Sequence, residues 1–335
     1  MLQETRVKAR HKVKRSVAVF VILMAGVLLI GVINIAIFFV VLYLCIGMKN
    51  IAAILAMGLA VAAVMACGPS SVKGLKTEIR EYQDSTAHSS LSIKAELPLP
   101  GQGEAARNIR AKLIEVMDGQ LSHIGSYEET RLFPPYEGGE DDTDRLLGYY
   151  REKALEAIGI LSQEDFDERV AYIEDLELLA DMPDWEYDFS LLKSKETERY
   201  VVFLSNDYVY QGGAHGGIIG QGGLTFDKKD GHLVEEFLQP GCQETIQPLL
   251  RKGLTQYFSG DGITVAPDGL DDFLLLETGL IPLPAWTPFP SEDGLVFTYQ
   301  QYEIAAYAAG MPNFSIPYEE ILPFLTPEAK ALLDL

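Results

Sequence analysis

Hydrophobic and polar positions divide the chain into an apolar N-terminus and a mixed remainder. Residues 17–47 contain no charged side chain, and a second apolar stretch covers residues 51–64. Basic residues precede the first stretch, which is the charge pattern of a transmembrane helix whose N-terminus faces the cytoplasm. The remainder opens with a polar segment at residues 68–88, which predicts a tether.

Residues 48–67 have the pattern of a bacterial lipoprotein signal. Lys49 supplies a positive start, the apolar stretch follows, and the segment ends in Ala66 and Cys67. This pattern predicts that Cys67 becomes a lipidated first residue and that residues 1–47 precede the true start of the protein. The alternative is that residues 17–47 anchor the chain in the membrane. In either case we expect the remainder to be extracytoplasmic, with the periplasmic side favoured.

After the tether, the period of the apolar positions predicts secondary structure. A period of two predicts strands at residues 89–98, 185–191 and 224–226, and a run of β-branched and aromatic residues predicts one at 200–210. Helical spacing predicts helices at residues 105–121, 144–158, 165–179 and 243–258. Ser162, three residues before Asp165, predicts a capping box for the third of these helices. Asp230-Gly231 indicates a hairpin turn. We therefore expect an α+β fold, with antiparallel sheets and packed helices in two parts at residues 89–231 and 232–335.

Two blocks resemble a known family. Residues 210–216 read Tyr-Gln-Gly-Gly-Ala-His-Gly, and residues 293–297, 302–310 and 316–318 form a second block. Together they resemble the extracytoplasmic domain shared by RsiV-type anti-sigma factors and the N-terminal region of PdaC-type peptidoglycan deacetylases. The resemblance implies an α+β domain outside the inner membrane. It implies no catalysis, because in that family the domain binds lysozyme or precedes a separate catalytic domain.

The charge balance narrows the class of partner. Residues 1–66 hold seven of the 27 basic and one of the 48 acidic residues, which leaves 20 and 47 in residues 67–335 and a formal charge of −27. Such a chain offers no basic face to a phosphate backbone, so nucleic acid is excluded as a partner. We expect a cationic protein such as lysozyme, or a cell-wall glycan.

None of the candidate catalytic motifs contains all the residues that its chemistry requires. Thr225-Phe226-Asp227 is similar to the metal-binding motif of polysaccharide deacetylases, but Lys228 follows where a second acid is needed. His215 lies in a glycine-rich turn, where it is either a ligand or acid/base group, or a structural residue that holds the turn. Cys242 is interpreted as a buried apolar residue. We therefore expect no cofactor and no metal.

The remaining candidates are binding residues. They are the turn residues Tyr210, Gly212, Gly213, His215 and Gly216, and the loop aromatics Trp286 and Phe289. The predicted function is that of a membrane-anchored envelope binding protein. The alternatives are an enzyme acting on envelope polysaccharide through His215 and a purely structural lipoprotein.

Overall fold

The computed structural model describes residues 74–124, 130–172, 184–212, 216–259, 264–266, 269–276 and 278–335. These residues belong to one compact unit, Pro69–Leu335. In this described part of the chain, no helix combines the length and the apolar character needed to cross a membrane. The apolar segment at 17–47 and the signal ending at Cys67 lie outside the described residues, so both stay predictions.

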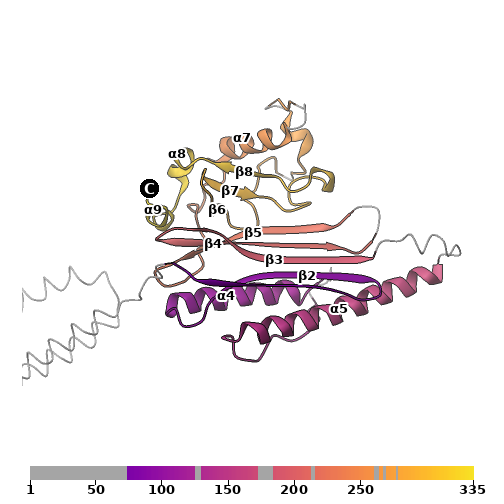
Figure 1. Ribbon diagram of the computed structural model, residues 1–335. Coiled ribbons are helices and arrows are strands. Elements are labelled where there is room, and N and C mark those ends of the chain that lie inside the picture. Colours follow the sequence, from indigo (N-terminus) through magenta and orange to yellow (C-terminus); the bar gives the residue numbers. More distant parts are fainter. Residues whose placement is uncertain are drawn as a thin grey trace, which may run out of the picture. The chain divides into compact units, whose positions relative to one another are not determined.

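A five-stranded sheet lies at the centre of the unit, in the order β1-β2-β3-β4-β5 (Figure 1). Its strands are β1 (Thr77–Ser85), β2 (Ser89–Pro98), β3 (Trp185–Glu196), β4 (Tyr200–Tyr210) and β5 (Ile218–Asp227). Neighbouring strands are antiparallel, except that β2 and β3 run parallel. The chain between these two strands includes the helices α4 (Glu104–Leu121) and α5 (Thr143–Tyr172), as a parallel crossover requires. The α+β class is confirmed, and the expected antiparallel sheet contains this one parallel pair.

The prediction of a tether at residues 68–88 is wrong at Thr77–Ser85, which is strand β1. The strand pairs along its whole length with β2. Arg80 Nε donates to Asp144 of α5 at 2.7 Å, and Arg151 Nε of α5 donates to Asp84 at 2.6 Å. The strand carries few apolar side chains, so it is stabilised by backbone pairing and by these ion pairs with a distant helix.

The helix predicted at residues 105–121 is confirmed as α4. The two helices predicted at 144–158 and 165–179 are instead one helix, α5, up to Tyr172, and the residues after it lie outside the described part. Ser162 is 1% exposed inside this helix, where its hydroxyl donates to the Gly159 carbonyl at 3.2 Å. The capping prediction was wrong because a serine in a helix interior can bond to its own preceding turn.

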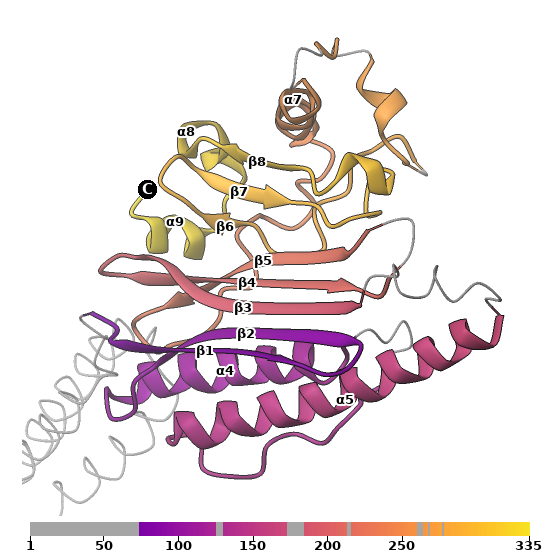
Figure 2. The same cartoon turned by 45° about the vertical axis from the view of Figure 1, so that its right-hand side comes forward.

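Helices α4 and α5 pack along β1 and β2 (Figures 1 and 2). They bury a first apolar core against one face of the sheet. Its largest fully buried members are Tyr150, Phe189, Phe203, Phe226, Ile93, Leu97, Ile109 and Leu113. Most of these come from period-two or helical positions, so the sequence pattern correctly predicted this core.

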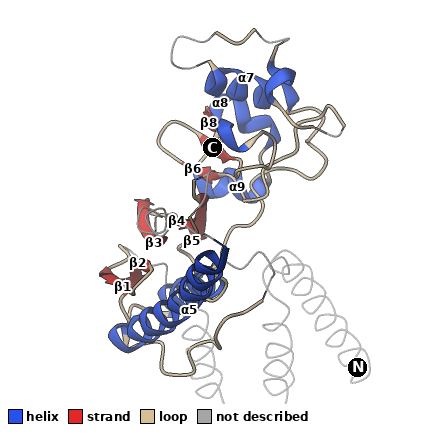
Figure 3. Ribbon diagram, turned by 90° about the vertical axis from the view of Figure 1, so that its right-hand side faces the viewer, coloured by secondary structure: helices blue, strands red, loops and turns tan. Residues whose placement is uncertain are grey.

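The C-terminal elements build a second core on the other face. They are α7 (Gln247–Phe258), η1 (Leu270–Phe273), β6 (Phe289–Pro290), β7 (Leu295–Thr298), η2 (Tyr307–Ala309), β8 (Asn313–Ile316), α8 (Tyr318–Ile321), η3 (Leu322–Phe324) and α9 (Pro327–Leu333). Strands β6, β7 and β8 form a small antiparallel sheet. Strand β4 serves both cores, because Val201 and Phe203 belong to the first while Tyr200 and Val202 belong to the second. The C-terminal elements lie beyond β5 (Figure 3).

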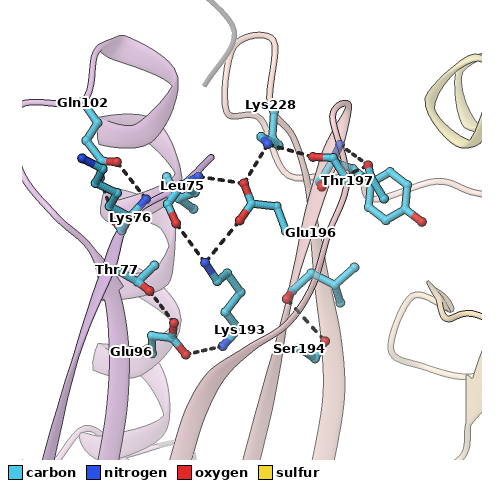
Figure 4. A network of polar contacts seen from close by, with 12 residues as sticks. Leu75, Lys76, Thr77, Glu96, Gln102, Lys193, Ser194, Glu196, Thr197 and Lys228 are labelled. Carbon is cyan, nitrogen blue, oxygen red and sulfur yellow. Dashed lines mark hydrogen bonds and ion pairs between the residues drawn. The ribbon is translucent and has the colours of Figure 1, made fainter. Parts of the chain in front are cut away.

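A network of polar contacts joins the start of the described chain to the β3–β4 hairpin (Figure 4). Lys228, 2% exposed, donates to Glu196 Oε1 at 2.7 Å and to the Thr197 carbonyl at 2.7 Å. Glu196 Oε1 also accepts from the Leu75 N–H at 2.7 Å. Lys193 Nζ links the Leu75 carbonyl at 2.8 Å to Glu196 Oε2 at 3.2 Å. The buried charges are thus paired and hydrogen-bonded, as burial requires.

Candidate functional site: a groove beside Trp286

The glycine-rich turn follows β4. Tyr210 is the last residue of β4, and Gly212 and Gly216 have positive φ angles of 72° and 75°. Such angles favour glycine, which explains two of the glycines in the motif. Gly213 and His215 lie outside the described residues, so both interpretations of His215 remain open.

Arg169 of α5 contacts the first residues of this turn. Its guanidinium donates to the Gln211 carbonyl at 2.7 Å and pairs with Asp165 at 2.6 Å. Asp165 in turn accepts from Trp185 Nε1 at 2.8 Å. The predicted binding motif is therefore fixed to α5 by a chain of charge-assisted hydrogen bonds.

Side chains of the C-terminal elements contact the end of the turn and the outer edge of β5. Tyr307 donates to the Gly217 carbonyl at 2.7 Å. Gln301 accepts from the Ile219 N–H at 2.8 Å, and Gln300 both accepts from and donates to the backbone of Gln221, at 3.0 and 2.8 Å. Side chains thus satisfy backbone groups that an edge strand would otherwise expose.

Trp286 and Phe289 pack against opposite faces of β5. A Cβ atom on Gly222 would overlap the indole of Trp286, and one on Gly223 would overlap the ring of Phe289. Because adjacent residues of a strand face opposite sides of the sheet, the two rings lie on opposite faces of β5. Residues 286–289, called the β5 clasp below, therefore straddle the edge of the sheet.

The two aromatic rings of the clasp have different surroundings. Phe289 packs against the second core, so it contributes to folding. Trp286 reaches the helix-covered face, where it is half-buried. Of the two predicted contact residues, Trp286 is the one placed beside an open groove.

This groove has a volume of about 410 Å³. Its walls come from α4, β5, the segment after the hairpin turn, and the clasp. They consist of Val116, Gly119, Gln120, Gly223, Leu224, Leu233, Val234, Glu235, Trp286 and Thr287. Thr287 donates to the Glu235 carbonyl at 2.9 Å, which ties the clasp to the segment after the hairpin. A mainly apolar wall with an indole and a few polar groups is the usual composition of a small-ligand site.

The deacetylase-like motif has a structural role in the described chain. Asp227 Oδ1 accepts from the Lys229 N–H at 2.7 Å, and the Gly231 N–H donates to the Asp227 carbonyl at 2.8 Å. Asp227 thus stabilises the turn after β5, as the hairpin interpretation expected. Among the described residues, no group of three or more His, Cys, Asp or Glu side chains is arranged to hold a metal ion.

Cys242 is 7% exposed and burial raises the pKa of its thiol, which confirms the buried apolar interpretation. It lies before α7, which begins at Gln247 rather than at the predicted residue 243.

The sequence singled out the glycines of the turn but missed those within β5. Gly220, Gly222 and Gly223 were not predicted as part of a site, although each receives a side chain from a neighbouring element. Their presence in a strand was the available signal, since glycine inside a strand often marks a close approach. The element that approaches could not be read from the strand itself.

The chain is similar to known proteins in sequence over one C-terminal segment and in structure over most of its length. Residues 235–319 match the family described as a protein of unknown function (DUF3298). A DUF3298 family member from Bacteroides fragilis has a similar structure, with a TM-score of 0.57 at 16% identity, covering 78% of this chain and 98% of that one. A DUF3298 family protein from Pseudomonas aeruginosa matches with a TM-score of 0.47 at 15% identity, covering 77% and 97%. A search of curated proteins found no match.

Proposed function

We propose that this chain is a non-catalytic binding protein of the cell envelope, and that its groove beside Trp286 binds cell-wall glycan. The observation that carries the proposal is the position of the indole, half-buried on Gly222 and at the wall of a groove of about 410 Å³. The sequence resemblance to RsiV-type and PdaC-type envelope domains supports the same class of function.

The groove matches the chemistry of a sugar ring. One face of a pyranose is apolar and stacks on an indole, while its hydroxyl groups need polar partners at the edge. Gln120, Glu235 and Thr287 supply an amide, a carboxylate and a hydroxyl at the groove wall. The rest of the wall is apolar, so the site favours a stacked ring over a free ion.

The proposal is tested by binding to an oligosaccharide. The full chain in mild detergent is titrated with an N-acetylglucosamine pentamer, and Trp286→Ala should weaken binding about tenfold, the loss expected for one stacking aromatic. Tyr172→Ala is the matched control, because Tyr172 is an 86% exposed aromatic on α5 outside the groove wall. Equal affinities of both variants and the parent would refute the role of the groove, and release of acetate from the pentamer would favour the enzymatic alternative.

A cationic protein such as lysozyme is the second candidate partner. The observation in its favour is the formal charge of −27 over residues 67–335, which follows from 20 basic and 47 acidic residues. An electrostatically steered complex should weaken steeply as salt rises, because the Debye length falls to about 8 Å at 0.15 M. Lysozyme binding that survives Trp286→Ala and disappears at high salt would replace the glycan proposal with this one.

We also propose that Cys67 carries the membrane anchor of the extracytoplasmic domain, since residues 48–67 have the lipoprotein signal pattern. Mass spectrometry of the native protein should detect acylated Cys67 at the N-terminus. Recovery of peptides spanning residues 15–49 would instead support a transmembrane anchor at residues 17–47.

A further inference from the structure

Asp207 lies on the face of the sheet that Trp286 covers, and no cationic side chain among the described residues pairs with its carboxylate. Its carboxylate occupies the space that a Cβ atom on Gly220 would take. Among the described residues, neither a hydrogen bond from another side chain nor an ion pair reaches it, and burial raises the pKa of this group. An ion in such a position raises the free energy of the folded protein unless a partner compensates it.

Strand geometry places Asp207 close to the indole. Asp207 pairs across the sheet with Gly220, while the indole lies on Gly222, two residues further along β5. Residues two apart on a strand face the same side and are separated by about 7 Å. Residue 221 points to the other face, and neither glycine has a side chain. Strand β5 therefore places no side chain of its own between the carboxylate and the indole.

Ser205 is a second polar residue on this face, and its hydroxyl makes no hydrogen bond within the described part of the chain. It lies on β4 between Phe203 and Asp207 on the same face, and pairs across the sheet with Gly222. Its side chain is fully buried, and Oγ has no hydrogen-bond partner in the described part of the chain. A buried hydroxyl without a partner costs about 1–3 kcal/mol, so packing alone does not account for a serine here.

We propose that an oligosaccharide bound in the groove extends past Trp286 toward Asp207, which is not one of the groove-wall residues, and that this end of the site selects a free amino group, with the ammonium held between the Asp207 carboxylate and the Trp286 indole. A carboxylate provides a charge-assisted hydrogen bond, and an indole face attracts a cation within about 6 Å. An N-acetylated sugar has no ammonium, so it gains the stacking contact but not the ionic one. This inference rests on the proposed glycan function and specifies the chemistry of its ligand.

The test compares two probes on the full chain in mild detergent: a glucosamine pentamer, with free amines, and an N-acetylglucosamine pentamer. The glucosamine pentamer should bind more tightly, and Asp207→Asn should weaken it roughly tenfold, as loss of one charge-assisted contact predicts, while leaving the N-acetylated probe unchanged. Asp188→Asn is the matched control, because Asp188 lies on the adjacent strand β3 and pairs with Tyr208, on the opposite face. Thermal unfolding of Asp207→Asn should match the parent or occur at higher temperature, because an amide removes an unpaired charge.

The outcomes separate the two proposals. Equal binding of both probes, unaffected by Asp207→Asn, overturns the amino-group inference and leaves the glycan function intact. Equal weakening by Asp207→Asn and Asp188→Asn also overturns it, because the effect would then come from the general acidic surface. If neither probe binds the parent protein, the glycan function itself fails.

Discussion

Removing the charge of Lys228 tests whether the network in Figure 4 stabilises the fold. The Lys228 side chain is 2% exposed, and its ammonium donates to Glu196 and to the Thr197 carbonyl, both at 2.7 Å. Lys228→Met keeps a long unbranched side chain but deletes the charge. Glu196 then loses its shortest ionic contact, and the Thr197 carbonyl loses this donor.

The expected loss follows from the burial of the pair. Removing one partner of a buried ion pair costs about 3–5 kcal/mol, because the other charge is left uncompensated. Glu196 keeps Lys193 at 3.2 Å and the Leu75 N–H at 2.7 Å, and its side chain is 21% exposed. We therefore expect the lower end, about 3 kcal/mol, which corresponds to a fall of roughly 6–12 °C in Tm for a unit of this size.

The assay is thermal and urea unfolding of the full chain in mild detergent, followed by circular dichroism. Lys229→Met is the matched control, because the exposed neighbour loses the same charge and should stay within about 0.5 kcal/mol of the parent. Combining Lys228→Met with Glu196→Gln should cost less than the sum of the single changes, since the partner charge has also gone. A Lys228→Met protein as stable as Lys229→Met, or strict additivity in the double variant, would refute the reasoning.

Two further predictions concern the β5 clasp and the C-terminal helix. Gly222→Ala should destabilise the protein by about 1–3 kcal/mol and change the tryptophan fluorescence, because the new Cβ would overlap Trp286. Gly119→Ala is the control and should be neutral or stabilising, because a Cβ at this position of α4 meets open space. Equal losses of stability in the two variants would contradict the contact between Trp286 and β5. His232 bonds Asp230 at 2.6 Å and Glu328 of α9 at 3.0 Å. Burial would lower the His232 pKa, but these two carboxylates outweigh it and raise the pKa. The stabilisation is therefore complete below the unfolded-state value of about 6.5 and is lost as pH rises through the raised folded value. Urea unfolding between pH 5 and 9 should show this loss in the parent and not in His232→Gln; identical profiles would contradict it.

The sequence alone was sufficient to predict the elements whose buried face follows from their own residues. The helix α4 and the strands β2 and β3 repeat apolar residues with the period of their element, so each predicts its buried face without knowledge of its neighbours. Strand β4 instead begins with an apolar run that is buried on both faces of the sheet. The turn after β5 was equally readable, because Asp227 and Gly231 make their contacts within a few residues. Trp286 was identified as a candidate binding residue for a similarly local reason, as an aromatic in a loop.

Only the tertiary structure decided which distant segments meet. Strand β1 is too polar to predict from its own pattern, and it exists because β2 and α5 supply partners. The groove has the same origin, since α4, β5 and the clasp become its walls only when the C-terminal chain folds back over the edge of the sheet. Asp207 is one acid among 48 in the sequence. It becomes distinctive because pairing with Gly220 places it on the face that holds Trp286, where no cation from the described part of the chain reaches it. Contacts between strands and a distant loop depend on the folded chain, so the local spacing of residues does not predict them.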